Sequence, residues 1–137
     1  MYREIDHKAD LFYEIVAENV DELLSDIVKI LLENSSEKYS ENKNILLIEC
    51  LKNFTKKCYN IDVTNVNTNN EFLDWLFDTV NEIISLIDSG FYPFKTEQGC
   101  VYFCERRINL AIKALTYHNL SMKYHEGKLY VRMVFDV

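Results

Sequence analysis

Two short stretches near the start of the chain alternate between apolar and polar positions. Residues 2–5 form the first stretch and residues 11–16 form the second. A period of two is typical of β-strands, because successive side chains of a strand point to opposite faces of the sheet. The polar residues 6–10 connect the two predicted strands, so Asp10 falls at the start of the second strand.

Two longer stretches repeat apolar residues at the spacing of an amphipathic helix. The first follows Asn19, which forms a capping-box pattern with Glu22, and it extends to Asn34. The second covers residues 71–88 and ends before Gly90, a residue that favours the end of a helix. The apolar positions that define these helices are Val20, Leu24, Ile27, Val28 and Leu31 in the first, and Phe72, Leu73, Leu76, Phe77, Val80, Ile83, Ile84 and Ile87 in the second.

The region between the two helices has a less regular pattern. Residues 35–44 are polar and are expected to form a loop. The apolar residues within 45–54 suit either a buried strand or a short helix, and we favour a strand. Residues 57–65 alternate at Ile61 and Val63 and are rich in β-branched side chains, which predicts another strand.

After Gly90 the pattern predicts only strands. They cover residues 92–96 and 101–107 as a hairpin around 97–99, then 110–117, then 120–124 and 128–135 joined through 125–127. In the last strand, side chains at odd-numbered positions from Leu129 form the more apolar face, and Asp136 points to the other face. The sequence therefore predicts an α+β fold, a single domain over residues 1–137 in which two amphipathic helices pack on mostly antiparallel β-sheets.

Length, composition and charge narrow the possible functions. A chain of 137 residues with 48% hydrophobic residues is long and apolar enough to fold around its own core. Its net charge of −7 argues against stable direct binding to nucleic acid and favours a basic partner. The sequence has no apolar run long enough to span a bilayer and no signal-peptide core at its start, so we expect no membrane association and a cytoplasmic location.

The chain has four cysteines, Cys50, Cys58, Cys100 and Cys104. Because no export signal is present, we expect reduced core residues rather than a disulfide framework. Their spacing gives little support to a metal or redox site. The sequence also has no P-loop and no GxSxG motif, so nucleotide binding and nucleophilic catalysis have little support.

The best candidate for chemistry lies at the end of the chain. Asp136 is covalently next to Val137, so its side-chain carboxylate and the α-carboxylate of Val137 are neighbouring oxygen donors. Hard oxygen ligands of this kind suit Ca²⁺ or Mg²⁺. The alternative interpretation is a solvated pair of carboxylates.

A lysine and two histidines are further candidates. Lys113 lies in the predicted 110–117 strand among apolar neighbours, where it either pairs with a carboxylate or extends into solvent from an edge strand. His7 and His118 are candidate metal ligands or general bases, although a single histidine is more often a hydrogen-bonded structural residue.

Five segments spread along nearly the whole chain carry a resemblance to a known family. They are Asp6-His7-Lys8-Ala9-Asp10, Asn19-Val20-Asp21-Glu22, Phe72-Leu73-Asp74-Trp75-Leu76, Lys113-Ala114-Leu115-Thr116-Tyr117-His118 and Val134-Phe135-Asp136-Val137. In this combination the sequence resembles the archease family, whose members are small activators of the GTP-dependent tRNA-splicing RNA ligase.

The resemblance implies a protein that is not itself an enzyme. It would bind the RNA ligase, promote guanylylation of the catalytic histidine of the ligase, and allow many turnovers in tRNA ligation. The resemblance also implies a divalent metal ion, calcium, held by Asp10, Asp136 and the terminal residue Val137. Lys113 would be a further residue required for activation, and His7 and His118 would lie around the metal site.

Two other functions remain open from the residues alone. One is a metal-dependent hydrolase that acts without a partner and uses Asp10, Asp136 and His118. The other is a chaperone-like binding module in which the metal ion has a purely structural role.

Overall fold

The computed structural model describes residues 1–5, 10–36, 43–63 and 69–137. No helix within these ranges is both long and apolar enough to cross a membrane. The helices and strands of the described residues follow in the order β1 (Tyr2–Ile5), β2 (Leu11–Ala17), α1 (Val20–Glu33), α2 (Lys43–Lys52), β3 (Thr55–Cys58), α3 (Asn69–Asp88), β4 (Phe91–Glu97), β5 (Cys100–Glu105), β6 (Ala114–His125) and β7 (Lys128–Asp136).

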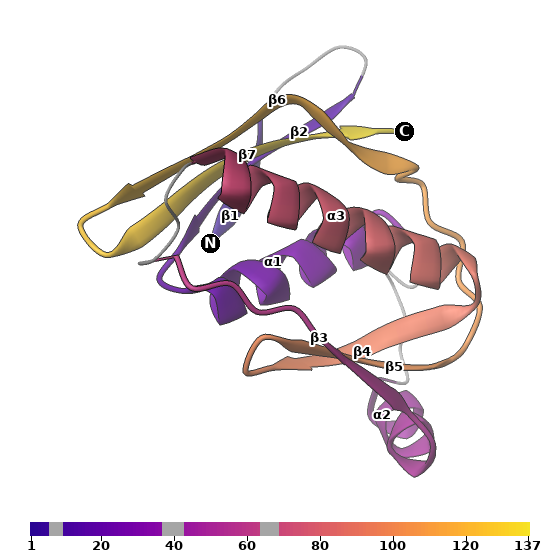
Figure 1. The fold of residues 1–137 in the computed structure, drawn as a ribbon. Helices are drawn as coiled ribbons and strands as arrows, with labels where there is room; N and C mark the ends of the chain where they lie inside the picture. The colour runs from indigo at the N-terminus through magenta and orange to yellow at the C-terminus, as the bar shows by residue number, and fades with distance from the viewer. Residues whose placement is uncertain (6–9, 37–42, 64–68) are drawn as a thin grey trace.

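These elements form layers, with two helices between two sheets (Figure 1). The first sheet has the strand order β1-β2-β7-β6 and the second has the order β3-β5-β4. Neighbouring strands in both sheets run antiparallel. Helices α1 and α3 lie between the sheets, whereas α2 lies outside on the three-stranded sheet. The predicted α+β fold, with amphipathic helices on antiparallel sheets, is confirmed.

The four-stranded sheet contributes one face to the core, because successive side chains of each strand point to opposite faces. On β7, Leu129, Val131, Met133 and Phe135 are fully buried on one face, as the sequence pattern predicts. The buried faces of α1 and α3 pack against this face, and apolar residues from the three-stranded sheet, such as Phe103, close the core from the other side. Because both faces of the helical layer are covered, α1 and α3 need wide apolar stripes.

The prediction of a strand within residues 45–54 is wrong, because this region forms helix α2. Among the described side chains of α2, from Leu47 onwards, Cys50 is the one that is buried. A helix on the outside of the molecule has no continuous core face, so its sequence lacks the periodicity that identifies α1 and α3. The next predicted strand, 57–65, is also displaced, since β3 covers Thr55–Cys58 and pairs with β5.

Two strands predicted separately, 110–117 and 120–124, form one long strand. Strand β6 starts at Ala114, and its pairing with β7 shifts between Thr116 and Ser121. Within this bulge Asn119 adopts a left-handed backbone with φ 65°, a conformation that asparagine tolerates better than most residues. The bulge bends one strand where the sequence pattern indicated a break between two.

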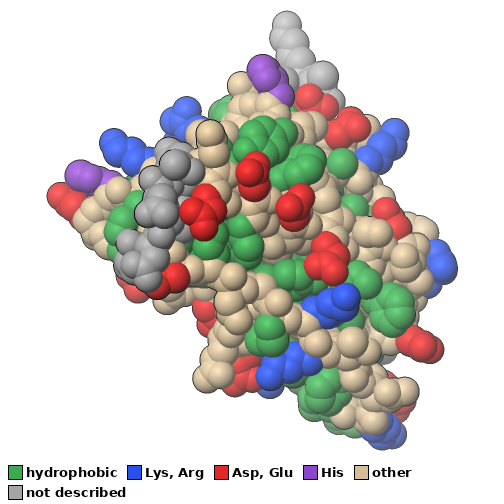
Figure 2. Space-filling view, in the orientation of Figure 1, with side chains coloured by type: hydrophobic (Ala, Val, Ile, Leu, Met, Phe, Trp, Pro, Cys, Tyr) green, Lys and Arg blue, Asp and Glu red, His purple; other side chains and the backbone are tan. Residues whose placement is uncertain are grey.

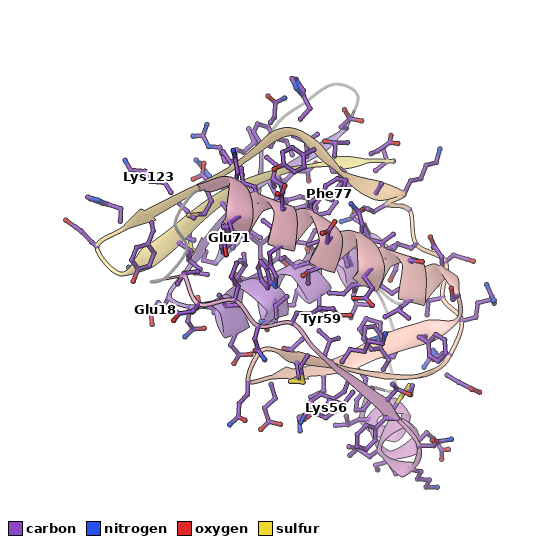
Figure 3. The ribbon with its side chains drawn as sticks, viewed as in Figure 1. Glu18, Lys56, Tyr59, Glu71, Phe77 and Lys123 are labelled. Carbon is purple, nitrogen blue, oxygen red and sulfur yellow. A yellow bond between two sulfur atoms is a disulfide. The ribbon has the colours of Figure 1, made fainter. Side chains whose placement is uncertain are left out.

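All four cysteines form disulfides, contrary to the expectation that they are reduced. Cys58 and Cys100 face each other across β3 and β5, and Cys50 of α2 is joined to Cys104 of β5. Figure 3 shows one disulfide near the β4–β5 turn and the other beside α2. The paired cysteines are 42 and 54 residues apart in sequence, so their proximity depends on the strand register and on the position of α2.

Candidate functional site

The ends of three strands meet at one end of the four-stranded sheet. Leu11, the first residue of β2, lies opposite Phe135 of β7, so the antiparallel register places Asp10 beside Asp136. On the other side of β7, Ala114 lies opposite Asp136. The structure therefore brings together Asp10, the start of the 113–118 segment and the 134–137 segment. Figure 1 shows the C-terminus beside the start of β6.

Lys113 is held at this end by its main chain. Its backbone N–H donates a hydrogen bond of 2.7 Å to the backbone carbonyl of Asp136. The side chains of Lys113 and Asp136 are exposed, Asp10 is half-buried and Val137 is 43% exposed. Lys113 lies just before β6, so the prediction that it shares a strand face with apolar neighbours is wrong.

The structure describes one of the two candidate histidines, His118. His7 lies outside the described residues. His118 is exposed and lies in the bulge of β6, and its carbonyl accepts a hydrogen bond of 3.3 Å from the Thr116 hydroxyl. It is four positions after Ala114, which pairs with Asp136, and at the rise of a strand this is roughly 13 Å. The structure therefore does not place the backbone of His118 next to that of Asp136.

Helix α3 holds the start of β6 in place. The Asn81 side chain accepts a hydrogen bond of 2.8 Å from the Leu115 N–H and donates one of 3.2 Å to the Leu115 carbonyl. In this way Asn81 takes the place of a neighbouring strand at the outer edge of β6, and it fixes the residue two positions after Lys113. Such pairing satisfies both backbone groups of a buried residue.

A second contact from α3 holds β6 two residues further along, at Tyr117. The Tyr117 hydroxyl donates a hydrogen bond of 2.7 Å to Asp74, and the Tyr117 ring packs against Phe77 with centroids 5.3 Å apart. The hydrogen bond to Asp74 raises the pKa of Tyr117 above its usual value, which keeps the hydroxyl a donor. No local sequence pattern indicated Asn81 or Asp74 as supporting residues, although their seven-residue spacing puts them on one face of α3.

The exposed surface of α3 is acidic. Figure 2 shows Asp and Glu side chains across the middle of the visible face, over the position of α3 in Figure 1. The exposed acidic residues of the helix include Glu71, Asp74, Asp78 and Glu82. A surface of this kind attracts a positively charged partner.

The donor chemistry at the strand ends suits a hard cation. Asp10 and Asp136 carry carboxylate oxygens, and the α-carboxylate of Val137 is the third ligand expected from the resemblance. Within the residues that the structure describes, no group of three or more His, Cys, Asp or Glu side chains is arranged to hold a metal ion. The expected ligand set is of a different kind, because it contains two aspartates and one main-chain carboxylate.

Comparison with known proteins identifies the family. The family model described as "Archease protein family (MTH1598/TM1083)" matches residues 2–137. The chain belongs to the archease family. It is 33% identical over 142 residues to "Protein archease" of Thermotoga maritima, and the match covers 99% of each chain.

A solved archease has the same fold. The crystal structure described as "an archease, possible chaperone (TM1083)" from Thermotoga maritima superposes with a TM-score of 0.63 and 30% identity. This match covers 100% of the present chain and 98% of the other. The resemblance stated from five sequence segments is thereby confirmed, together with the fold that it implied.

Proposed function

We propose that this archease-family protein is a non-catalytic activator of the GTP-dependent tRNA-splicing RNA ligase. It would promote guanylylation of the catalytic histidine of the ligase and enable repeated turnover in tRNA ligation. The observation that carries this proposal is the convergence at one end of the sheet of Asp10, Asp136 and Lys113, which the resemblance implies as functional residues. Strand order brings these residues to one place, and the family resemblance is what indicates that they act as one site.

At this end of the sheet, Asp10, Asp136 and the α-carboxylate of Val137 would hold a divalent cation, for which we propose calcium. A bound cation supplies charge stabilisation and orientation for phosphate groups. Two side-chain carboxylates beside a third carboxylate repel one another, and this repulsion favours occupation by a cation. Lys113, exposed next to Asp136, would contact a phosphate or a carboxylate of the partner.

The acidic surface of α3 would serve the same partner. A ligase that binds RNA needs positive charge to neutralise phosphates, and exposed Asp and Glu residues on α3 complement such a surface. Since α3 also anchors β6 through Asn81 and Asp74, the docking surface and the position of Lys113 depend on the same helix. Docking would therefore bring Lys113 to a defined place on the ligase.

The test is a turnover experiment with a cognate ligase. The purified protein, at substoichiometric amounts, is added to the ligase with GTP and a broken tRNA, and ligated products per ligase molecule are counted. We expect many products per ligase with the protein, and about one or fewer without it. Equal product counts in both reactions would contradict the proposed function.

A second experiment tests the metal site directly. Asp10→Ala should weaken calcium binding in a calorimetric titration and leave the circular dichroism spectrum unchanged. Asp88→Ala removes an exposed carboxylate from the end of α3 and serves as the control. Equal affinity in the Asp10 variant would remove this residue from the ligand set.

Two alternatives give other results in these experiments. In the partner-free hydrolase, the protein alone would turn over a substrate. The separation of the His118 backbone from that of Asp136 along β6 does not favour this reaction. In a chaperone-like module with a structural ion, calcium removal would lower the melting temperature, and activation would be lost only where the protein unfolds. The proposed activator should lose activation at temperatures where its fold is intact.

A further inference from the structure

Helix α2 differs from the other two helices in how it is attached. It lies on the outer face of the three-stranded sheet, away from the core between the sheets (Figure 1). From Leu47 to the end of the helix, Cys50 is buried, with 3% exposure, while Ile48 and Leu51 are 59% and 51% exposed. The buried side chain is the one that forms the disulfide with Cys104.

The disulfide borders a cavity that opens to the surface. This cavity has a volume of about 370 Å³ and is lined by both Cys50 and Cys104, together with Asn53, Arg106, Glu49 and Glu105. A small molecule of the size of a dithiol fits a space of this volume. The sulfur atoms, although buried, are therefore next to a route for a reactant.

We propose that Cys50–Cys104 is a thiol–disulfide exchange site, and that its reduction by a dithiol releases α2 from the sheet. This inference is independent of the proposed function. A thiolate of the dithiol attacks one sulfur and forms a mixed disulfide, while the Cys50–Cys104 bond breaks and the other cysteine leaves as a thiolate. The second thiol of the reductant then displaces the first cysteine, so two electrons and two protons pass from the dithiol to the two cysteines.

The second disulfide has a different structural role. Cys58 and Cys100 lie on neighbouring strands that also pair from Thr55 to Phe103 along the β3–β5 ladder. Breaking this disulfide leaves the ladder in place, so β3 stays attached. No strand ladder joins α2 to β5. Reduction of Cys50–Cys104 therefore removes the covalent link between the helix and this strand.

Release of α2 would uncover an aromatic surface on the sheet. Phe54 follows α2 and packs against Tyr102 and Phe94, with ring centroids 5.5 and 6.0 Å away. Phe54 is already 45% exposed. Movement of the helix would also displace Phe54, so the redox state would control how much of this apolar face meets solvent.

The experiment is hydrogen exchange with mass spectrometry on the full chain, with and without dithiothreitol as the dithiol. We expect amides of residues 43–52 to exchange roughly tenfold faster or more after reduction, while those of α1 and α3 keep their protection. Disulfide mapping after thiol blocking must first show the Cys50–Cys104 pair in the oxidised protein. Its absence there, or equal exchange of residues 43–52 in the two states, would overturn the proposal.

Two double variants identify which disulfide is responsible. Cys50→Ser with Cys104→Ser should give fast exchange in residues 43–52 even without dithiothreitol. Cys58→Ser with Cys100→Ser is the matched control and should keep the slow exchange until the dithiol is added. The reverse result would assign the effect to the β3–β5 disulfide and contradict the inference. If a variant fails to fold, the exchange of the wild-type protein with and without dithiothreitol still tests the proposal.

Discussion

At the level of single residues, the main chain positions Lys113 and leaves its side chain available. Its N–H is bonded to the Asp136 carbonyl, and the next contact along the chain is the pairing of Leu115 with Asn81. Neither contact involves the ammonium group. The position of Lys113 and the charge of Lys113 can therefore be changed separately.

Lys113→Ala should abolish the stimulation of ligase guanylylation while calcium affinity and melting temperature stay near the wild-type values. The reason is that alanine keeps the backbone hydrogen bond and removes only an exposed cation. Lys123→Ala is the control, since Lys123 is exposed on the same strand, at the far end from Asp136 (Figure 3). Radiolabelled GMP transfer to the ligase gives the stimulation, and full stimulation by the Lys113 variant would refute a direct role.

Asn81→Leu tests the anchoring of β6 to α3. Leucine has a similar size but leaves the N–H and carbonyl of Leu115 without partners, which we expect to cost about 2 to 4 kcal/mol of unfolding free energy. Urea denaturation measures this loss, and the exposed Ser85→Leu on the same helix should change stability by less than about 0.5 kcal/mol. An unchanged midpoint for Asn81→Leu would show that water replaces the amide without cost.

At the level of elements, the local sequence pattern predicted those helices and strands that have one side facing the core. Helices α1 and α3 and the hairpin turns at Gly99 and Gly127 follow their sequence patterns, because a wide apolar stripe or a left-handed turn has a clear signature. From Leu47 to Lys52, helix α2 has exposed apolar residues and a single buried side chain, Cys50, so this part of the helix presents no continuous apolar face. The single strand β6 was divided because its bulge interrupts the alternation.

Asn19→Ala measures how much one local signal contributes to α1. The Asn19 side chain accepts a hydrogen bond of 2.8 Å from the Glu22 N–H at the start of the helix. Its loss should cost about 1 kcal/mol of unfolding free energy, whereas Asn19→Ser keeps an acceptor and should restore most of it. If thermal melts showed the two variants to be equally stable, the cap would not contribute through its side chain.

At the level of the whole molecule, the candidate site depends on long-range register. The sequence alone identified Asp10, Asp136 and Lys113 as separate polar positions, and only their resemblance to a family grouped them. The structure places them together because β7 lies between β2 and β6, which follows from strand order and from no local pattern. The disulfides were not predicted because the lack of an export signal favoured reduced cysteines. The register of β3 and β5, which aligns Cys58 with Cys100, has no local signature in the sequence.

Two tyrosines make the free energy of unfolding depend on pH in the alkaline range. Burial raises the pKa of Tyr2 well above its usual value, and a hydrogen bond from its hydroxyl to Glu33 adds to this effect. Burial also raises the pKa of Tyr59, with a further contribution from the negative charge of Glu82. Tyr2 and Tyr59 lie near carboxylates that are distant in sequence, Glu33 and Glu82, so both tyrosines lose these environments when the protein unfolds.

The free energy of unfolding should therefore fall as the pH rises above about 10, the pKa of tyrosine in an unfolded chain. Above this pH the unfolded chain releases protons that the folded protein retains, so the folded state loses up to about 1.4 kcal/mol per pH unit for each tyrosine. Below pH 10 both states bind these protons, and the contribution is fully present. Urea unfolding at pH 9, 10 and 11 measures the slope, which Tyr59→Phe should reduce and the exposed Tyr124→Phe should leave unchanged. Equal slopes for the wild type and Tyr59→Phe would show that Tyr59 does not hold its proton more tightly in the folded protein.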